Sequence, residues 1–252
     1  RNRERNIASD GVGFISNTYD LTSAKLQTVV VTGAAAGTTL GFGTSGTNPV
    51  SGEGGGVNLI DASAYTGDFS VNTTNVTADD KAGVGLTIKT GGGDDAAVLA
   101  GSATVITGAG DDRIETAASA ATVMYGGTGN DHFDVELSTG VLGGAVIMDL
   151  ESFDKIEMAG SFTAGTLGAK EDVGAAASLG AALEIANGSS GVSADQLVWF
   201  QYGGNTYLYA DLAATSGGAH QTLDSNDNIV AIIGLVDLEA SPFTSAGIVT
   251  VI

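Results

Sequence analysis

The sequence contains no cysteine, and among its 252 residues there are only two prolines, two histidines and nine basic residues. Without cysteine the chain can form neither disulfide bridges nor thiol-based sites, so cysteine usage does not indicate whether the protein works in an oxidising or a reducing compartment. The nine basic residues face 29 acidic ones, and a net charge of −20 would repel the phosphates of a nucleic acid. No apolar run approaches the roughly 18 residues of a membrane-spanning helix. The composition therefore argues against nucleic-acid partners and against membrane insertion.

The chain is nevertheless suited to a packed fold. Hydrophobic residues make up 43% of it, and glycine is abundant, at 39 residues. Because proline is scarce, this composition does not resemble a disordered Pro/Gly-rich tail. The N-terminus, Arg1–Arg5, lacks the apolar core of a signal peptide, and the sequence does not begin with Met. We expect a fragment of a longer protein.

Motifs of the common enzyme classes are missing. The two histidines, His132 and His220, lie 88 residues apart, and there is no H-E-x-x-H zinc motif. Neither a G-x-S-x-G elbow nor a Walker-type phosphate loop occurs. The adjacent pair Asp79-Asp80 could imitate a glycosidase dyad, but neighbouring acidic residues in such a chain indicate a solvated loop. We expect no enzymatic activity, and His132 as a bystander.

Three short segments share a pattern, G-G-x-G-x-D-x-U-x, in which U is a large apolar residue. They are Thr90–Val98, Thr107–Glu115 and Gly126–Asp134. The glycines allow a tight turn, the Asp supplies a hard oxygen ligand, and the apolar residue begins a strand. The fit is incomplete, because Thr replaces the first Gly in two segments and Ala97 occupies the apolar position of the first. The pattern predicts stacked calcium-binding turns.

The spacing of these turns predicts how they stack. Seventeen residues separate Asp95 from Asp112 and nineteen separate Asp112 from Asp131, an average of 18, or two nonapeptides. The three turns should therefore lie on one side of a parallel β-roll. The intervening segments Leu99–Ile106 and Ala117–Met124 carry no Asp, so small uncharged turns should close the opposite edge.

The predicted metal sites lie between turns, because one turn offers about half of the 6–8 oxygens that calcium requires. The side-chain ligands are Asp95, Asp112 and Asp131, and the other expected ligand residues are Thr90, Gly92, Thr107, Ala109, Gly126 and Thr128. Asp94, Asp111 and Asn130 precede the ligand aspartates at a variable motif position and are second choices. The alternative is a metal-free stack whose turns merely cap strands, but three turns in register favour calcium. Magnesium suits flexible carbonyl-rich loops less well.

We expect an all-β fold, a calcium-binding parallel β-roll or β-solenoid with a small C-terminal β-rich cap containing one helix. The predicted regions are 1–56, a β-rich segment ending in a loop over 38–56; 57–150, the roll; and 151–252, a C-terminal secretion-type domain packed on it. Within the last region, Asp172–Asn187 predicts the helix. A hairpin is predicted around Gly203-Gly204-Asn205, with its aromatic residues in a core rather than on a ligand platform.

The nonapeptides resemble the RTX repeats of proteins exported by type I secretion from Gram-negative bacteria. Val146–Met158 resembles the block that follows such repeats. Leu197–Asp211, together with Asp224–Leu235, resembles the C-terminal secretion region of RTX proteases and surface-layer proteins. Asp61–Asn72 resembles a recurring motif of RTX surface-layer proteins. Together they cover about residues 58–240. The resemblance implies export in an unfolded state, through an uncleaved C-terminal signal, and folding in external calcium. It also implies calcium ligands at Asp149 and Asp154, with Asp211, Asp224 and Asp227 in second rank.

On this basis we expect the C-terminal part of a bacterial surface-layer (S-layer) protein, secreted to the cell surface, whose Ca2+ ions hold the roll and bridge copies of the chain. Its expected partners are other copies of itself, the type I secretion apparatus and, through regions outside this segment, cell-surface polysaccharide. The alternative is the non-catalytic calcium and secretion domain of an RTX protease or other RTX enzyme. A β-solenoid polysaccharide lyase is a third class, disfavoured because the sequence shows no acid/base cluster.

Overall fold

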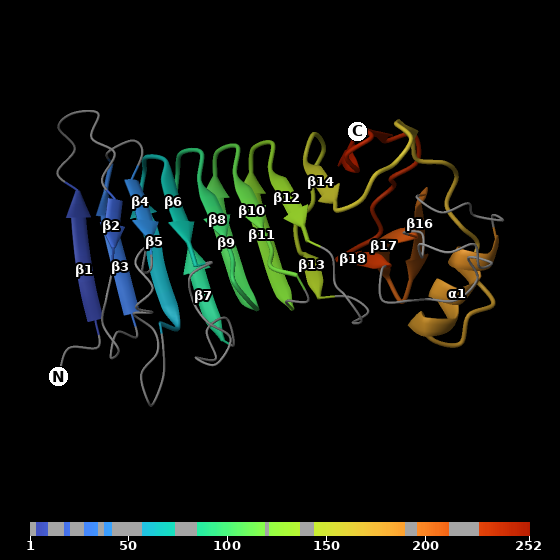
Figure 1. The fold of residues 1–252 in the computed structure, drawn as a ribbon, viewed down its shortest axis with the longest axis horizontal. Helices are drawn as coiled ribbons and strands as arrows, with labels where there is room; N and C mark the ends of the chain where they lie inside the picture. The colour runs from blue at the N-terminus through green and yellow to red at the C-terminus, as the bar shows by residue number, and fades with distance from the viewer. Residues whose placement is uncertain are drawn as a thin grey trace.

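The fold is described from a computed structural model. It describes residues 4–9, 18–20, 28–34, 38–41, 57–73, 85–118, 121–136, 144–189, 196–211 and 227–252. In these ranges the chain forms twenty β-strands and one α-helix. The strands form two ten-stranded sheets, and the helix lies at the C-terminal end of the molecule (Figure 1). The all-β class is therefore confirmed.

Up to Met158 the strands alternate between the two sheets along the chain. In spatial order the first sheet contains β1 (Glu4–Ser9), β3 (Thr28–Gly33), β5 (Leu59–Tyr65), β7 (Leu86–Lys89), β9 (Ala103–Ala109), β11 (Thr122–Thr128), β13 (Ala145–Ile147), β18 (Asn228–Ile232), β17 (Asn205–Asp211) and β16 (Gln196–Tyr202). The second contains β15 (Gly165–Thr166), β19 (Pro242–Phe243), β20 (Ile248–Thr250), β14 (Lys155–Met158), β12 (His132–Val135), β10 (Arg113–Glu115), β8 (Ala96–Val98), β6 (Phe69–Asn72), β4 (Thr38–Gly41) and β2 (Thr18–Asp20).

Strands that neighbour one another within this first part pair in parallel. Ile88 of β7 aligns with Val105 of β9, and Ile114 of β10 with Phe133 of β12. From β5 to β12, the connections from odd-numbered to even-numbered strands are short and lie along one edge of the molecule, where the predicted Asp-bearing turns are found (Figure 1). Strand β4 lies inside the segment expected to be a loop, 38–56, and residues 42–56 lie outside the described ranges.

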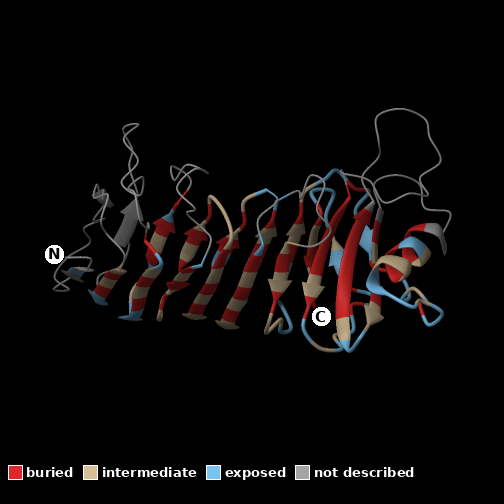
Figure 2. Ribbon diagram, turned by 90° about the horizontal axis from the view of Figure 1, so that it is seen from below, coloured by how far each residue is buried: buried red, intermediate tan, exposed pale blue. Residues whose placement is uncertain are grey.

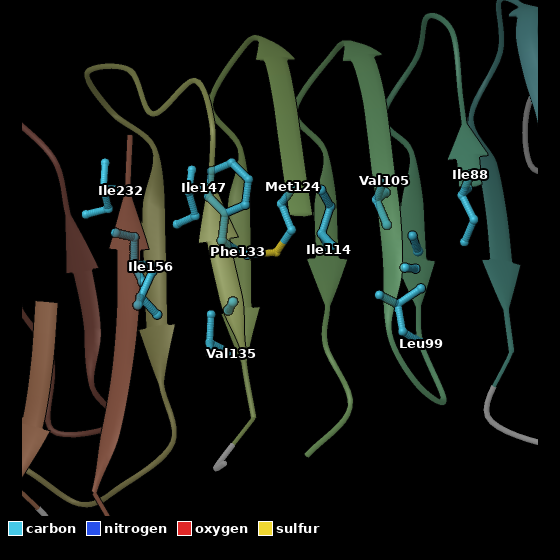
Figure 3. Packing of buried hydrophobic residues seen from close by; sticks show 14 of the residues in the cluster. Ile88, Leu99, Val105, Ile114, Met124, Phe133, Val135, Ile147, Ile156 and Ile232 are labelled. Atoms are coloured by element: carbon cyan, nitrogen blue, oxygen red, sulfur yellow. The ribbon is translucent and has the colours of Figure 1, made fainter. Parts of the chain in front are cut away.

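The main core lies between the two sheets. Alternate residues of strands such as β9 and β11 point inward, as their alternating burial shows (Figure 2). Ile88, Val105, Met124 and Ile147 of the first sheet pack with residues of the second such as Ile114, Phe133 and Ile156 (Figure 3). All of these side chains are at most 1% exposed. The strands are therefore held face to face by one continuous apolar cluster.

Beyond Met158 the pairing changes, and neither sheet is parallel throughout. Strands β16, β17 and β18 pair in antiparallel order, as do β14 with β20 and β15 with β19. The two-residue turn Gly203-Gly204 makes the β16–β17 hairpin, with both glycines at positive φ. A parallel roll therefore does not describe either complete sheet, because a two-residue connection can join only antiparallel strands.

The predicted helix exists, but its predicted start is wrong. It spans Leu179–Ser189 as α1 rather than beginning at Asp172. The Ser178 hydroxyl accepts a hydrogen bond from the Ala181 amide at 3.2 Å, which caps the helix there. Leu183 and Ala186 pack on Phe200 and Tyr207 in a second core, on the outer face of the hairpin. This coverage from both sides explains why four of the five residues of β18 are buried (Figure 2).

Candidate metal site

The Asp-bearing turns pack backbone against backbone, and glycine makes this approach possible. Gly110 and Gly129 both have φ at +136°. A Cβ at Gly129 would lie closer to the Gly110 carbonyl oxygen than real Cβ contacts allow, and a Cβ at Gly110 would collide in the same way with Gly93. Each turn therefore rests directly on the turn before it.

The predicted ligand aspartates form one file across these turns. The Asp154 carboxylate accepts a hydrogen bond from the Asp131 amide at 2.9 Å, and the Asp131 carboxylate accepts one from the Asp112 amide at 3.0 Å. Asp112 accepts from the Asp95 amide at 2.7 Å, and Asp95 from the Phe69 amide at 2.8 Å. We call Asp95, Asp112, Asp131 and Asp154 the inner file. Every member reaches the turn that precedes its own.

The inner file is buried, and part of it lacks partners. Its four residues are 1–2% exposed. The Oδ2 atoms of Asp95 and Asp112 are both buried without a hydrogen-bond partner. Thr90 lies beside Asp95, but its single hydroxyl proton points to the Thr107 carbonyl oxygen at 2.6 Å. Two buried carboxylate oxygens therefore remain available to a hard cation.

Burial shifts the titration of the whole file. It raises the pKa of Asp95 to about 6 and that of Asp131 to about 7. Burial also raises the pKa of Asp112 and Asp154. Neighbouring carboxylates add to the effect: Asp112, Asp154 and Asp149 all raise the pKa of Asp131. The file therefore favours a proton or a cation over free negative charge.

The other predicted ligand residues lie at equivalent, aligned positions of successive turns. Thr90, Thr107 and Gly126 follow one another at the first motif position, and Gly92, Ala109 and Thr128 are in register at the third. Asp149 stands apart from the inner file, since its carboxylate accepts hydrogen bonds from the amides of Gly126 at 3.0 Å and Gly127 at 3.1 Å. This alignment brings the backbone carbonyl groups of these residues into the turns that also carry the carboxylates, as a metal site between turns requires.

A second, exposed row runs beside the inner file in the opposite sense. The carboxylates of Asp68, Asp94 and Asp111 accept hydrogen bonds from the amides of Asp94, Asp111 and Asn130, at 3.0, 3.0 and 2.9 Å. Each reaches the following turn. Asp68 was not predicted as part of the stack, although the signal Gly67-Asp68 before an apolar residue was present. Phe69 occupies the inner-file position of that turn, and its ring contacts Tyr65 at 6.0 Å between centroids.

On the opposite edge, the described residues bridge turns with hydroxyl groups, in line with the uncharged turns expected there. The Thr73 hydroxyl accepts a hydrogen bond from the Ala100 amide at 2.9 Å, and the Thr116 hydroxyl accepts one from the Glu136 amide at 3.1 Å. Ser102 accepts one from the Ala121 amide at 2.9 Å. No Asp or Glu side chain contributes to these three bonds. Carboxylates thus bridge the turns on one edge and hydroxyls on the other.

The chain matches no protein-family model and no curated protein. In the described ranges, no three Asp, Glu or His side chains form a group that could hold a metal ion by themselves. Also in those ranges, no helix is long and apolar enough to cross a bilayer. A metal in the stack would therefore depend on backbone carbonyl oxygens. The unpartnered carboxylate oxygens and the aligned backbone carbonyl groups fit calcium in this respect, since both supply hard oxygen ligands.

The remaining candidate residues lie away from the stack or outside the described ranges. His132 is half-buried on the outer face of β12, with Nε2 3.1 Å from Glu157 Oε2, and burial lowers its pKa. Among the hairpin aromatics expected in a core, Trp199, Phe200, Tyr207 and Tyr209 are at most 9% exposed, and Tyr202 is half-buried against the second core. Asp211 ends β17 and Asp227 is buried beside β18. Four further residues named in the sequence analysis lie outside the described ranges: Asp79, Asp80, His220 and Asp224.

Proposed function

We propose that the Asp-bearing turns belong to a calcium-binding parallel β-roll, which serves as a structural segment of an extracellular bacterial surface layer. The single observation that carries the calcium part is the inner file with its two unpartnered, buried oxygens, Oδ2 of Asp95 and of Asp112. Buried carboxylates are costly unless they are neutralised, and a divalent cation held between turns neutralises two at once. The parallel, registered strands on either side of the turns support the roll.

Calcium would be held between successive turns. The residues that would hold it are the inner-file aspartates, with the carbonyl-bearing residues Thr90, Gly92, Thr107, Ala109, Gly126 and Thr128. Asp149 would extend the set at the C-terminal end, where it already contacts the Gly126 turn. The ion would supply positive charge beside carboxylates that otherwise accept hydrogen bonds from backbone amides. Folding would then depend on calcium.

The surface-layer part of the proposal rests on the RTX-type sequence resemblance and on charge. A net charge of −20 opposes self-association unless cations screen or bridge it. In external calcium the exposed row Asp68, Asp94 and Asp111 loses this repulsion. Export by type I secretion in an unfolded state agrees with a chain whose folding waits for calcium outside the cell.

Isothermal titration of the chain with calcium tests the site. We expect at least two ions to bind, and Asp131→Asn to remove or weaken at least one, because it replaces a buried carboxylate in the file. Asp134→Asn is the matched control, since Asp134 pairs with Arg113 on the outer face of the second sheet. The absence of calcium binding, or equal losses in both variants, would contradict the proposed site.

Electron microscopy with and without calcium tests assembly. We expect calcium to convert the chain into ordered sheets or large oligomers, and magnesium at the same concentration to be less effective. A chain that binds calcium but stays monomeric at high concentration would retain the calcium site and exclude the surface-layer role. That outcome would favour the alternative, a calcium and secretion domain of an RTX enzyme.

A further inference from the structure

The first motif position is threonine in two of the three repeats, and the structure assigns these threonines a bond between turns. The Thr90 hydroxyl donates to the Thr107 carbonyl oxygen at 2.6 Å. The Thr107 hydroxyl donates to the Gly126 carbonyl oxygen at 2.8 Å, with the Tyr125 carbonyl oxygen at 3.2 Å. Both threonines are at most 4% exposed. Each hydroxyl therefore links its turn to the next one, in a site closed to water.

The third repeat is built differently at the same position. A Cβ at Gly126 would collide with the Asp131 carboxylate, so that carboxylate occupies the space that threonine fills in the other turns. Instead of a hydroxyl, the carboxyl group of Asp149 joins this turn to the next one. At the first motif position, the first two junctions thus carry neutral hydroxyl bonds and the third carries a carboxylate, in addition to the inner-file bonds.

The two carbonyl oxygens that accept the hydroxyl bonds belong to Thr107 and Gly126, both among the expected calcium ligands. A carbonyl oxygen that is buried without a donor or a cation is destabilising. The hydroxyl proton satisfies it when no ion is present. When an ion takes that oxygen, the hydroxyl bond contributes less, because the cation supplies the positive partner.

We propose that Thr90 and Thr107 are place-holders: their hydroxyls occupy carbonyl oxygens that calcium binds, and so hold the first two junctions together in the ion-free state. They would lower the calcium dependence of these junctions relative to a junction that begins with glycine. This inference rests on the proposed calcium site. It identifies Thr90 and Thr107 as the residues that set how strongly folding depends on calcium.

The double variant Thr90→Val, Thr107→Val tests this proposal, because valine keeps the shape of threonine and removes the donor. We expect the thermal unfolding midpoint at pH 6.0 to fall by several degrees in EGTA and by less than half as much in saturating calcium. Thr90→Ser with Thr107→Ser should restore the wild-type midpoint, since serine retains the hydroxyl.

Thr122→Val is the matched control. Thr122 is fully buried at the start of β11, and its hydroxyl has no hydrogen-bond partner. Its replacement should leave the midpoint unchanged or raised in both conditions.

The outcomes separate the two proposals. Equal losses with and without calcium, or no loss in EGTA, would overturn the place-holder role and leave the calcium site intact. A wild-type chain with no unfolding transition in EGTA at pH 6.0 would also overturn the role, because the hydroxyls would then hold nothing without the ion. A wild-type midpoint that does not respond to calcium would overturn the calcium site itself.

Discussion

The two edges of the sheet stack close their turns with different chemistry. On one edge, buried carboxylates of Asp95, Asp112, Asp131 and Asp154 accept the backbone amides of the preceding turns. On the other, hydroxyls of Thr73 and Thr116 accept them. Hydroxyls satisfy an amide with no change of charge, whereas a file of buried carboxylates adds repulsion and desolvation. A bound calcium ion, as proposed, would offset this cost on the acidic edge.

Glycine replacement should produce the largest difference between the edges. Gly129→Ala on the acidic edge forces a side chain into the Gly110 backbone at a φ of +136°. We expect a loss of about 3 kcal/mol or more, from backbone strain and overpacking together. Gly85→Ala on the opposite edge has the same kind of left-handed φ, +78°, but open space around it, and should cost about 1 kcal/mol. Urea unfolding in calcium measures both, and equal losses would show that close stacking is not specific to the acidic edge.

Of the two edges, pH should affect the acidic one. The lowered pKa of His132, on the outer face of β12, acts in the opposite direction but involves a single group. Burial places the pKa of Asp95 at about 6 and that of Asp131 at about 7, above the ordinary value of 3.8. The folded state therefore binds protons more tightly than the unfolded chain, and the stability gained is present in acid and lost as pH rises through 6–7. In EGTA the thermal midpoint should fall by several degrees between pH 5 and pH 8. A midpoint that rises with pH over this range would contradict the buried file.

Neutralising one inner-file aspartate should have opposite effects with and without calcium. Asp112→Asn retains an oxygen for the Asp95 amide and removes a buried negative charge. In EGTA at pH 7.5 we expect a gain in stability on the order of 1 kcal/mol, and in calcium a loss of similar size. Urea unfolding in EGTA and in calcium measures the change in the free energy of unfolding. A change of the same sign in both conditions would show that the inner file does not bind the cation.

The neutral edge should give the smallest effect. Thr116→Val removes the acceptor of the Glu136 amide and should cost about 1 kcal/mol, equally in EGTA and calcium. Thr116→Ser keeps the acceptor and serves as the control. A loss of stability at Thr116 that depends on calcium would show that both edges respond to the ion, contrary to the account.

The sequence predicted the acidic edge well because its signal is local. Glycines at fixed positions before each Asp require a tight turn, and a spacing near 18 places Asp95, Asp112 and Asp131 together. The turn containing Asp68 was missed because Phe69 stands where the motif has Asp, and such a substitution can be identified only from the register.

The C-terminal part was predicted less completely. The hairpin around Gly203-Gly204 was found because a two-residue glycine turn between aromatic strands is a local signal. Its entry into the first sheet, through antiparallel pairing of β17 with β18, which itself lies parallel to β13, depends on contacts distant in sequence. The start of α1 was misplaced because the acidic residue Asp172 was read as the first turn, whereas Ser178 caps the helix. The division of the chain at residues 56 and 150 stays a prediction.

The most direct test of the account is the thermal unfolding midpoint of the intact chain at pH 7.5 in EGTA, in millimolar magnesium and in millimolar calcium. Two sites at a hundredfold excess over their dissociation constants would contribute about 2.7 kcal/mol each. For a chain of this size that corresponds to a rise of roughly 10–20 °C. The account predicts a rise of this size with calcium and a much smaller one with magnesium. Identical midpoints in all three solutions would contradict it.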